Sequence, residues 1–315
     1  MHCVHCVVCV HYVCAMTDST SITTTTDASV LFDRYLADSD LRPHTRATYV
    51  SAMRRFVADL DGRQVSTAAI AGWRDHLLAS GWSVLSVNAY LSAVRTFMAW
   101  AAAHGLCHDH AAPVRSARAD KFFRRDPLSA SEAAHLLACA PDARARLVLE
   151  LELRAGLRGV ELHRMNVGDR QTRRGRDVVL VQGKGRDAKD GLVVLCPETV
   201  AAWDAYMVHR GPVRPSDPLL VAGRGRGAGA RMTVRSIRRI VTDALMAAKV
   251  KAPTITAHSL RHTCADLLIR AGANITDVQQ VLRHSSADTT MIYTKRAVAD
   301  ARLAQPVELT LSHLF

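Results

Sequence analysis

The feature that most constrains the fold is a change of hydrophobic pattern near residue 112. From residue 28 to about residue 112, apolar residues recur three and four positions apart, which places them on one face of an α-helix. The pattern predicts four helices, over residues 29–40, 44–60, 66–81 and 86–105. Thr45 and Ser66 are the expected N-caps of the second and third helices, and Gly81 is the expected glycine after the third. Residues 28–112 are therefore predicted to form a small all-helical domain.

From residue 128 to residue 304 the pattern mixes two periods. Segments 129–140, 143–156 and 198–211 keep the helical spacing, and the chain from residue 253 onwards is again helical with short polar breaks. Residues 176–195 alternate apolar and polar positions around a glycine-containing turn, which predicts two strands. The expected fold class is therefore mainly α with a small β-sheet, in which a helical domain precedes a mixed α/β domain.

The charge of the chain points to a polyanionic partner. Its 315 residues include 41 Lys and Arg against 29 Asp and Glu, a formal net charge of +12. Nucleic acid is the expected polyanion, although a basic enzyme without such a partner has the same composition. A connector over residues 113–127 is basic, and it either lies along a DNA backbone or is a solvated linker. The candidate DNA contacts are Arg124 and Arg125 in this connector and, on one face of a predicted helix, Arg235, Arg238 and Arg239.

Residues 1–27 are expected to contribute no folded structure. Residues 17–27 are polar and low in complexity. Residues 1–15 are apolar, with interspersed cysteines and histidines, and lack the basic start of a secretory signal; translation from Met16 would omit them. The other cysteines are scattered through apolar segments, which indicates reduced thiols in the cytoplasm. No run of transmembrane length is present, so no membrane partner is expected. No metal or other cofactor is expected either.

Two short motifs place arginine beside other polar groups. In TAHSLRHT, His258 and Arg261 share a face in the first turn of a helix, where free amides favour an anion. The planar guanidinium of Arg261 suits phosphate oxygens. In LRAGLRGVEL, Gly156 suggests a break between helices that would let Arg158 point into a cleft, with Glu161 orienting it through a charge-assisted hydrogen bond. Each motif alone is also compatible with ordinary surface residues.

A lysine, a histidine and a tyrosine add reactive groups. Lys184 lies between glycines at the tip of the predicted hairpin, where its ammonium could protonate a leaving alkoxide, although an ordinary turn has the same sequence. His284 ends a helix predicted over residues 275–284, and Tyr293 lies on a separate short helix. A phenol has a pKa near ~10. Tyr293 therefore needs neighbouring positive charge to act as a nucleophile.

The segments AGLRGVEL, GKG, HSLRHT and LRHSSADTTMIYT, in this order, resemble the signature of the tyrosine recombinases, also called phage integrases. The resemblance covers nearly all of residues 128–304, and the helical domain before it resembles the SAM-like core-binding domain of that family. Where the family often has glycine before the second histidine, this chain has Arg283, which either contacts DNA or is solvated. Matched by motif, the catalytic positions of the family fall on Arg158, Lys184, His258, Arg261, His284 and Tyr293, with Glu161 as the supporting acidic residue.

The resemblance implies a site-specific recombinase that performs integration, excision or resolution. Tyr293 would attack a DNA phosphate, form a 3′-phosphotyrosyl bond and release a 5′-hydroxyl, so that strands exchange without ATP. The expected partners are double-stranded DNA with specific sites and further copies of the chain in a tetramer, or a related recombinase as a hetero-partner. The helical domain is too short for an extra arm-binding module, which favours a simple Xer-like recombinase.

Some expectations are left open by the sequence. The tail over residues 305–315 would pack either on a neighbouring subunit or on its own domain. One alternative activity is cleavage and religation without exchange, as by a type IB topoisomerase. The other is sequence-specific DNA binding without cleavage.

Overall fold

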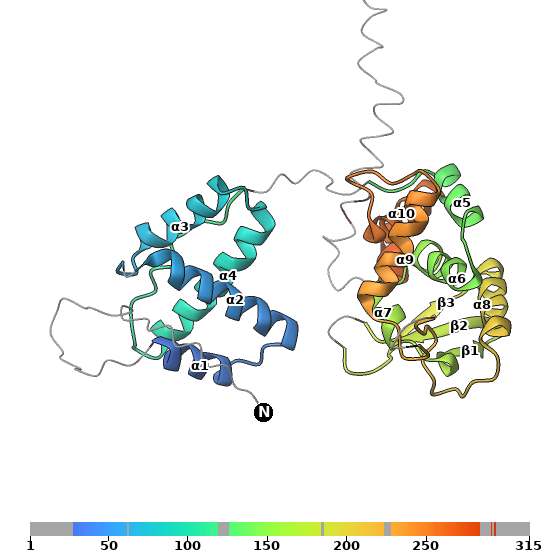
Figure 1. Ribbon diagram of the computed structural model, residues 1–315, viewed down its shortest axis with the longest axis horizontal. Helices are drawn as coiled ribbons and strands as arrows, with labels where there is room; N and C mark the ends of the chain where they lie inside the picture. The colour runs from blue at the N-terminus through green and yellow to red at the C-terminus, as the bar shows by residue number, and fades with distance from the viewer. Residues whose placement is uncertain are drawn as a thin grey trace, which may run out of the picture. The chain divides into compact units, whose positions relative to one another are not determined.

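The computed structural model describes residues 28–61, 63–118, 126–183, 186–223, 228–283, 291 and 293. Within these residues the chain forms eleven α-helices and one three-stranded sheet, so the predicted class, mainly α with a small sheet, is confirmed. The chain divides into two compact units between Phe122 and Phe123 (Figure 1). Each unit has its own hydrophobic core. The predicted leader, residues 119–125 of the connector, and the tail lie outside the described residues.

The first unit is a bundle in which α4 contacts each of the three preceding helices. The buried residues of α4 include Val87, Leu91, Val94 and Met98, the three- and four-residue spacing on which the prediction depended. All four predicted helices are present: α1 (Ala28–Asp38), α2 (Pro43–Leu60), α3 (Thr67–Ala79) and α4 (Val84–Ala103).

The predicted caps of this unit are confirmed in part. The side chain of Ser66 accepts a hydrogen bond from the backbone N–H of Ala69 at 3.1 Å, as an N-cap does. Gly81 follows α3 with a φ of +81°, a conformation that glycine adopts without strain. The prediction of Thr45 as an N-cap is wrong, because α2 already begins at Pro43. Proline suits the first turn, since its fixed φ is helical and its missing N–H would have no helical partner.

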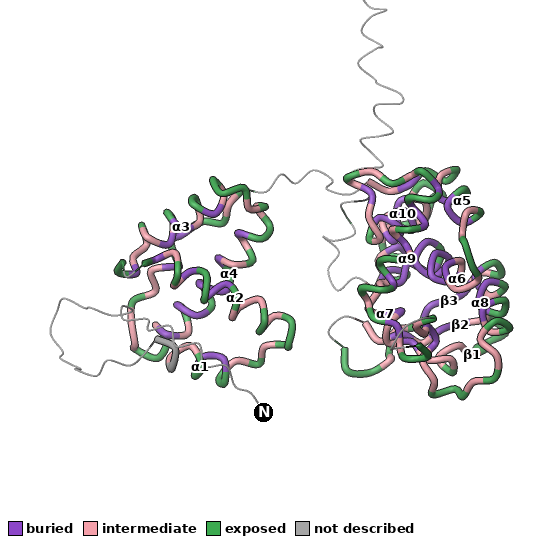
Figure 2. Tube along the Cα trace, in the orientation of Figure 1, coloured by how far each residue is buried: buried purple, intermediate pink, exposed green. Residues whose placement is uncertain are grey.

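The second unit is organised around α6 (Ala143–Leu153), which lies between α9 and α10 on one side and α8 on the other (Figure 1). Every residue of α6 from Leu147 to Leu153 is buried, the two glutamates included (Figure 2). The other helices are α5 (Ala130–Ala138), α7 (Gly159–Arg164), α8 (Pro197–Arg210), α9 (Val234–Ala247), α10 (Ala257–Arg270) and α11 (Ile275–Leu282).

The sheet is antiparallel, in the order β1-β2-β3. The predicted strand pair corresponds to β2 (Arg176–Val181) and β3 (Gly191–Val194), in which Val179 pairs with Val193. The sequence did not predict β1 (Arg170–Arg173), because the segment RQTR has no apolar alternation. This edge strand is held by its backbone pairing with β2 and by the side chain of Arg170, which forms ion pairs with Asp177 of β2 and Asp204 of α8.

Candidate active site

The candidate site begins at the break between α6 and α7. Gly156 has a φ of +58°, so the chain turns in the left-handed region that glycine tolerates. Arg158 then occupies the N-cap of α7, and its backbone N–H donates to a carboxylate oxygen of Glu161 at 2.8 Å. The predicted break at Gly156 is confirmed, and it places Arg158 and Glu161 at the start of the same short helix.

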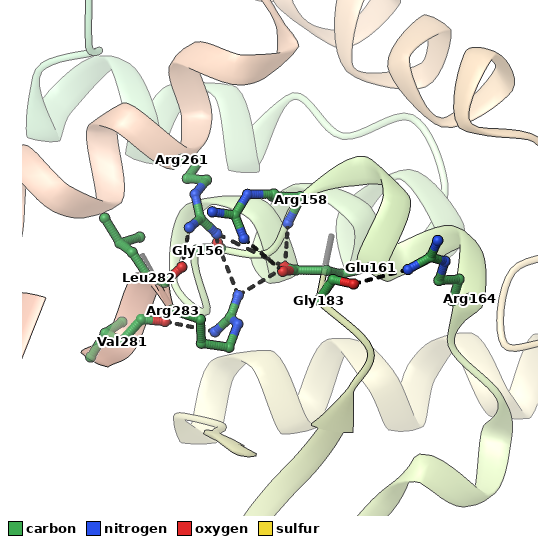
Figure 3. Close-up of polar contacts among 9 residues, drawn as sticks. All are labelled: Gly156, Arg158, Glu161, Arg164, Gly183, Arg261, Val281, Leu282 and Arg283. Carbon is green, nitrogen blue, oxygen red and sulfur yellow. Dashed lines mark hydrogen bonds and ion pairs between the residues drawn. The ribbon is translucent and has the colours of Figure 1, made fainter. Parts of the chain in front are cut away.

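The carboxylate of Glu161 is the centre of a cluster of arginines (Figure 3). It accepts from Arg158 Nη1 at 2.9 Å and from Arg283 Nη2 at 2.8 Å, and Arg261 Nη1 lies 3.9 Å away. Glu161 is fully buried. Burial alone would raise its pKa, but Arg283, the N–H of Arg158 and the other two guanidinium groups lower the pKa of Glu161 below its ordinary value. The three guanidinium groups and one carboxylate therefore carry a net positive charge.

Arg261 connects three segments of the second unit. It lies in the first turns of α10, as predicted, and is 2% exposed. Its guanidinium donates to the backbone carbonyls of Gly156 and of Leu282, at the end of α11 (Figure 3). Burial lowers the pKa of Arg261 to about 9, and the charge of Arg158 adds to the decrease, so the side chain is still protonated at pH 7.

Arg283 belongs to the same cluster. Its side chain is 13% exposed and paired with Glu161. Of the two alternatives left open for Arg283, simple solvation is therefore wrong, and contact with DNA stays a prediction. It caps α11 with a φ of +53°, where a residue with a side chain is strained relative to glycine. The position of an arginine where the family often has glycine was the sequence signal. Its pairing with Glu161, 122 positions away, was not readable from that signal.

Tyr293 lies against His262, the residue that follows Arg261 on α10. Its hydroxyl is 2.5 Å from Nδ1 of His262, and its side chain is 5% exposed, packed with Cys264 and Leu282. Burial raises the pKa of Tyr293 to about 12, although the charges of Arg261 and Arg158 act to lower it. Sequence reasoning assigned no role to His262. The available signal was its position four residues after His258, one helical turn along α10.

His258 occupies the first turn of α10 and is exposed. Its ring lies edge-on to that of His262, with 4.7 Å between the ring centroids. Lys184 and His284 lie outside the described residues. The residue before Lys184 is fixed, because Nη1 of Arg164 donates to the carbonyl of Gly183 at 2.9 Å (Figure 3).

Three of the five arginines predicted to contact DNA lie on α9. Arg235, Arg238 and Arg239 are all exposed, and Arg239 forms an ion pair at 3.6 Å with Asp243, one turn further along. Arg124 and Arg125 lie outside the described residues. In the part of the chain that the structure describes, no group of three or more His, Cys, Asp or Glu side chains is placed to hold a metal ion. None of the described helices is long and apolar enough to span a membrane.

The site thus combines a buried carboxylate that accepts hydrogen bonds from arginines with a tyrosine whose hydroxyl contacts His262 of α10. Guanidinium groups suit the binding of a phosphate, and a phenol can act as a nucleophile. A model of the phage integrase family matches residues 127–299, and a model of the phage integrase N-terminal SAM-like domain matches residues 30–105. The chain belongs to the phage integrase family.

Known proteins resemble the chain over most of its length. Tyrosine recombinase XerC of Mycobacterium leprae (strain TN) is 32% identical over 296 residues, which cover 86% of this chain and 95% of the relative. Two crystal structures share the fold. XerH recombinase bound to difH in a post-cleavage complex has a TM-score of 0.69 and 17% identity, covering 89% of this chain and 84% of that one. A lambda integrase dimer on a core site has a TM-score of 0.67 and 21% identity, covering 84% and 94%.

The expected class of enzyme is confirmed: the chain is a tyrosine recombinase that breaks and rejoins DNA at specific sites. Neither cleavage without exchange nor binding without cleavage is favoured. The catalytic roles of the single residues stay predictions.

Proposed function

We propose that Tyr293 is the nucleophile of this recombinase and that Arg158 and Arg261 bind the phosphate it attacks. The observation that supports this most is that two neighbouring residues of α10 contact both parts of the site. The consecutive residues Arg261 and His262 contact, respectively, the Glu161 cluster and the hydroxyl of Tyr293. Phenol and guanidinium groups therefore belong to one site, although Tyr293 and Arg158 are far apart in sequence.

The electrostatics of the cluster suit a phosphodiester. Its net positive charge is built before DNA arrives, since Glu161 is already ionised and bonded. A preorganised cation stabilises the charge that develops on the nonbridging oxygens as Tyr293 attacks. Arg158 is 24% exposed, so it is the more accessible of the two arginines to a phosphate. The arginines thus supply the neutralisation that metal ions supply in many phosphoryl transfers.

The other predicted residues complete the reaction. Tyr293 displaces the 5′ oxygen and remains bonded to the 3′ phosphate. Lys184 protonates that leaving oxygen, and Arg164 anchors its loop at Gly183. His258, exposed at the first turn of α10, and His284, directly after Arg283, donate hydrogen bonds to the phosphate.

The substrate is double-stranded DNA that contains specific recombination sites. The exposed arginines of α9, with Arg124 and Arg125 of the connector, contact its backbone. Exchange between two sites needs four active subunits, so the working assembly is a tetramer of this chain or a mixed tetramer with a related recombinase. The reaction takes place in the cytoplasm, where the thiols of Cys107, Cys139, Cys196 and Cys264 stay reduced.

A suicide substrate tests the proposal. A duplex nicked just 3′ of the cleavage site loses the short 5′-hydroxyl fragment, which traps the covalent adduct. Wild-type enzyme should form the adduct, and Tyr293→Phe should bind the DNA yet form none. Tyr206→Phe is the matched control, because Tyr206 is also buried in the second unit and its hydroxyl has no hydrogen-bond partner among the described residues. An adduct with Tyr293→Phe would identify a different nucleophile.

A further inference from the structure

Tyr293 and His262 form a polar contact in the site, yet His262 is not among the predicted catalytic residues. The two residues are 31 positions apart, yet the distance between Oη and Nδ1 is 2.5 Å and the ring centroids are 5.3 Å apart. His262 is half-buried on α10, and Tyr293 belongs to a buried apolar cluster that includes Cys264 and Leu282. The phenol oxygen, which is the proposed reacting atom, therefore meets a nitrogen base inside the protein.

A buried phenol needs such a base. Its proton must leave as the oxygen attacks, and burial makes that loss harder, since the pKa of Tyr293 is about 12. Imidazole is the side chain best suited to accept a proton near neutral pH. In the tautomer of neutral imidazole that carries its proton on Nε2, Nδ1 has a lone pair, and Nδ1 of His262 is the atom that lies against the hydroxyl of Tyr293.

We propose that His262 is a catalytic residue of this recombinase, the general base that accepts the proton of Tyr293. The inference rests on the proposed role of Tyr293 as nucleophile. As the Oη–P bond forms, the O–H proton passes to Nδ1, the bond between phosphorus and the 5′ oxygen breaks, and that oxygen takes a proton from Lys184. In rejoining, the protonated His262 returns its proton to the departing phenol oxygen.

The two histidines of α10 then have separate tasks. His258 is exposed in the first turn of α10, where the proposed function has it donate a hydrogen bond to the phosphate. His262, one turn further along, is half-buried and contacts the nucleophile. Their rings touch edge to face, which keeps both in fixed orientations. The motif His-x-x-Arg-His of this chain therefore combines phosphate binding with activation of the tyrosine.

The first experiment measures single-turnover adduct formation on the suicide substrate. His262→Ala should bind DNA like wild type but cleave about 10²–10⁴-fold more slowly, the usual contribution of a general base. His262→Asn, which keeps a hydrogen-bonding group but not a base, should be similarly slow. His135→Ala, at an exposed histidine of α5, is the control and should cleave normally. A near-wild-type rate for His262→Ala would overturn the proposal.

The second experiment separates activation of the nucleophile from protonation of the leaving group. A substrate with sulfur at the 5′ bridging position has a leaving group that needs no proton. It should relieve the defect of Lys184→Ala and leave the defect of His262→Ala unchanged. Relief of both defects would place His262 on the leaving-group side and contradict the assignment.

The third experiment distinguishes a base from a positioning residue. Replacing Tyr293 by 3-fluorotyrosine lowers the pKa of the phenol with little change of shape. If His262 removes the proton, the slowing caused by His262→Ala should shrink with the fluorinated enzyme. Equal slowing with both phenols would mean that His262 only holds the ring in place. An adduct with Tyr293→Phe, by contrast, would refute the proposed nucleophile itself.

Discussion

Replacing Glu161 by glutamine should destabilise the second unit more than any other removal of a single carboxylate charge there. The carboxylate is fully buried, and its three arginine partners are 24%, 13% and 2% exposed. Glutamine keeps an acceptor for the N–H of Arg158 but removes the one negative charge that, within the described part of the chain, contacts all three guanidinium groups. Loss of one partner from a buried ion pair costs about 3–5 kcal/mol, because the remaining charge stays buried without compensation.

The comparison variant is Glu198→Gln. Glu198 also lies near an arginine, with Arg154 Nη1 at 3.7 Å, but its side chain is 53% exposed. An exposed pair of this kind contributes little to stability, because water screens the two charges. The assay is hydrogen exchange of peptides from α6 at increasing urea concentration, since α6 is buried in the core of the same unit. Equal loss of stability in the two variants would refute the idea that Glu161 holds the arginines together.

The pH dependence gives a second readout of the same variant. Because the pKa of Glu161 is lowered in the folded state, its stabilisation is fully present above the ordinary value of 4.5 and is lost as the pH falls through the folded-state pKa. The stability difference between wild type and Glu161→Gln should therefore be large at pH 7 and shrink in acid. Adduct formation by Glu161→Gln at pH 7 should fall by about 10²-fold, since misplaced catalytic groups lose about that much. A difference in stability that did not change with pH would contradict an ionised Glu161.

Four further outcomes are expected. Gly156→Ala should lower the free energy of unfolding by about 2–4 kcal/mol, because φ is +58° and the new Cβ would lie 2.7 Å from Leu282. The control Gly175→Ala, where the new Cβ meets open space, should lose only the energy of the left-handed backbone conformation. Urea unfolding measures both variants. Arg283→Gly and Glu161→Gln should be non-additive by about 0.5–3 kcal/mol in a double-mutant cycle, since the pair is 2.8 Å apart. Burial raises the pKa of Glu152 to about 8, so wild type should lose stability relative to Glu152→Gln as the pH rises from 4.5 to about 8 in unfolding titrations. Replacing the three exposed arginines of α9 by glutamine should weaken DNA binding and reduce the slope of log K against log salt by about 0.9 per lost phosphate contact.

The sequence predicted those features of the site that depend on the local chain. Gly156 predicted the break that exposes Arg158, and the spacing of His258 and Arg261 predicted their shared face, because helical geometry relates residues three and four apart. It could not predict which side chains meet across helices. Arg283 reaches Glu161 over 122 positions, and that contact depends on how α7, α10 and α11 pack, which no local pattern encodes.

Strand β1 and the burial of Glu152 were also not predicted, because both depend on contacts between elements. The polar segment of β1 has no periodicity to detect, since only pairing with β2 makes it a strand. Glutamate is usually found at the protein surface, yet the carboxylate of Glu152 is buried, because α8, α9 and α10 enclose α6. Charged residues in an otherwise apolar helix are read as its solvent face, and only the neighbouring helices decide otherwise.

Arg261 shows why structure and catalysis are difficult to separate in this site. Its guanidinium bonds the carbonyl of Gly156, at the break before Arg158, and that of Leu282, whose side chain packs against Tyr293. Two of its five N–H donors are thus used by the backbone, and the same cation is expected to meet the phosphate. A loss of cleavage after Arg261→Ala would combine two buried carbonyls left without a donor, about 1–3 kcal/mol each, with the loss of transition-state stabilisation. Glu161, by contrast, forms polar contacts with the guanidinium groups of three arginines and with the N–H of Arg158, so its substitution tests the assembly of the site without removing a group proposed to touch DNA.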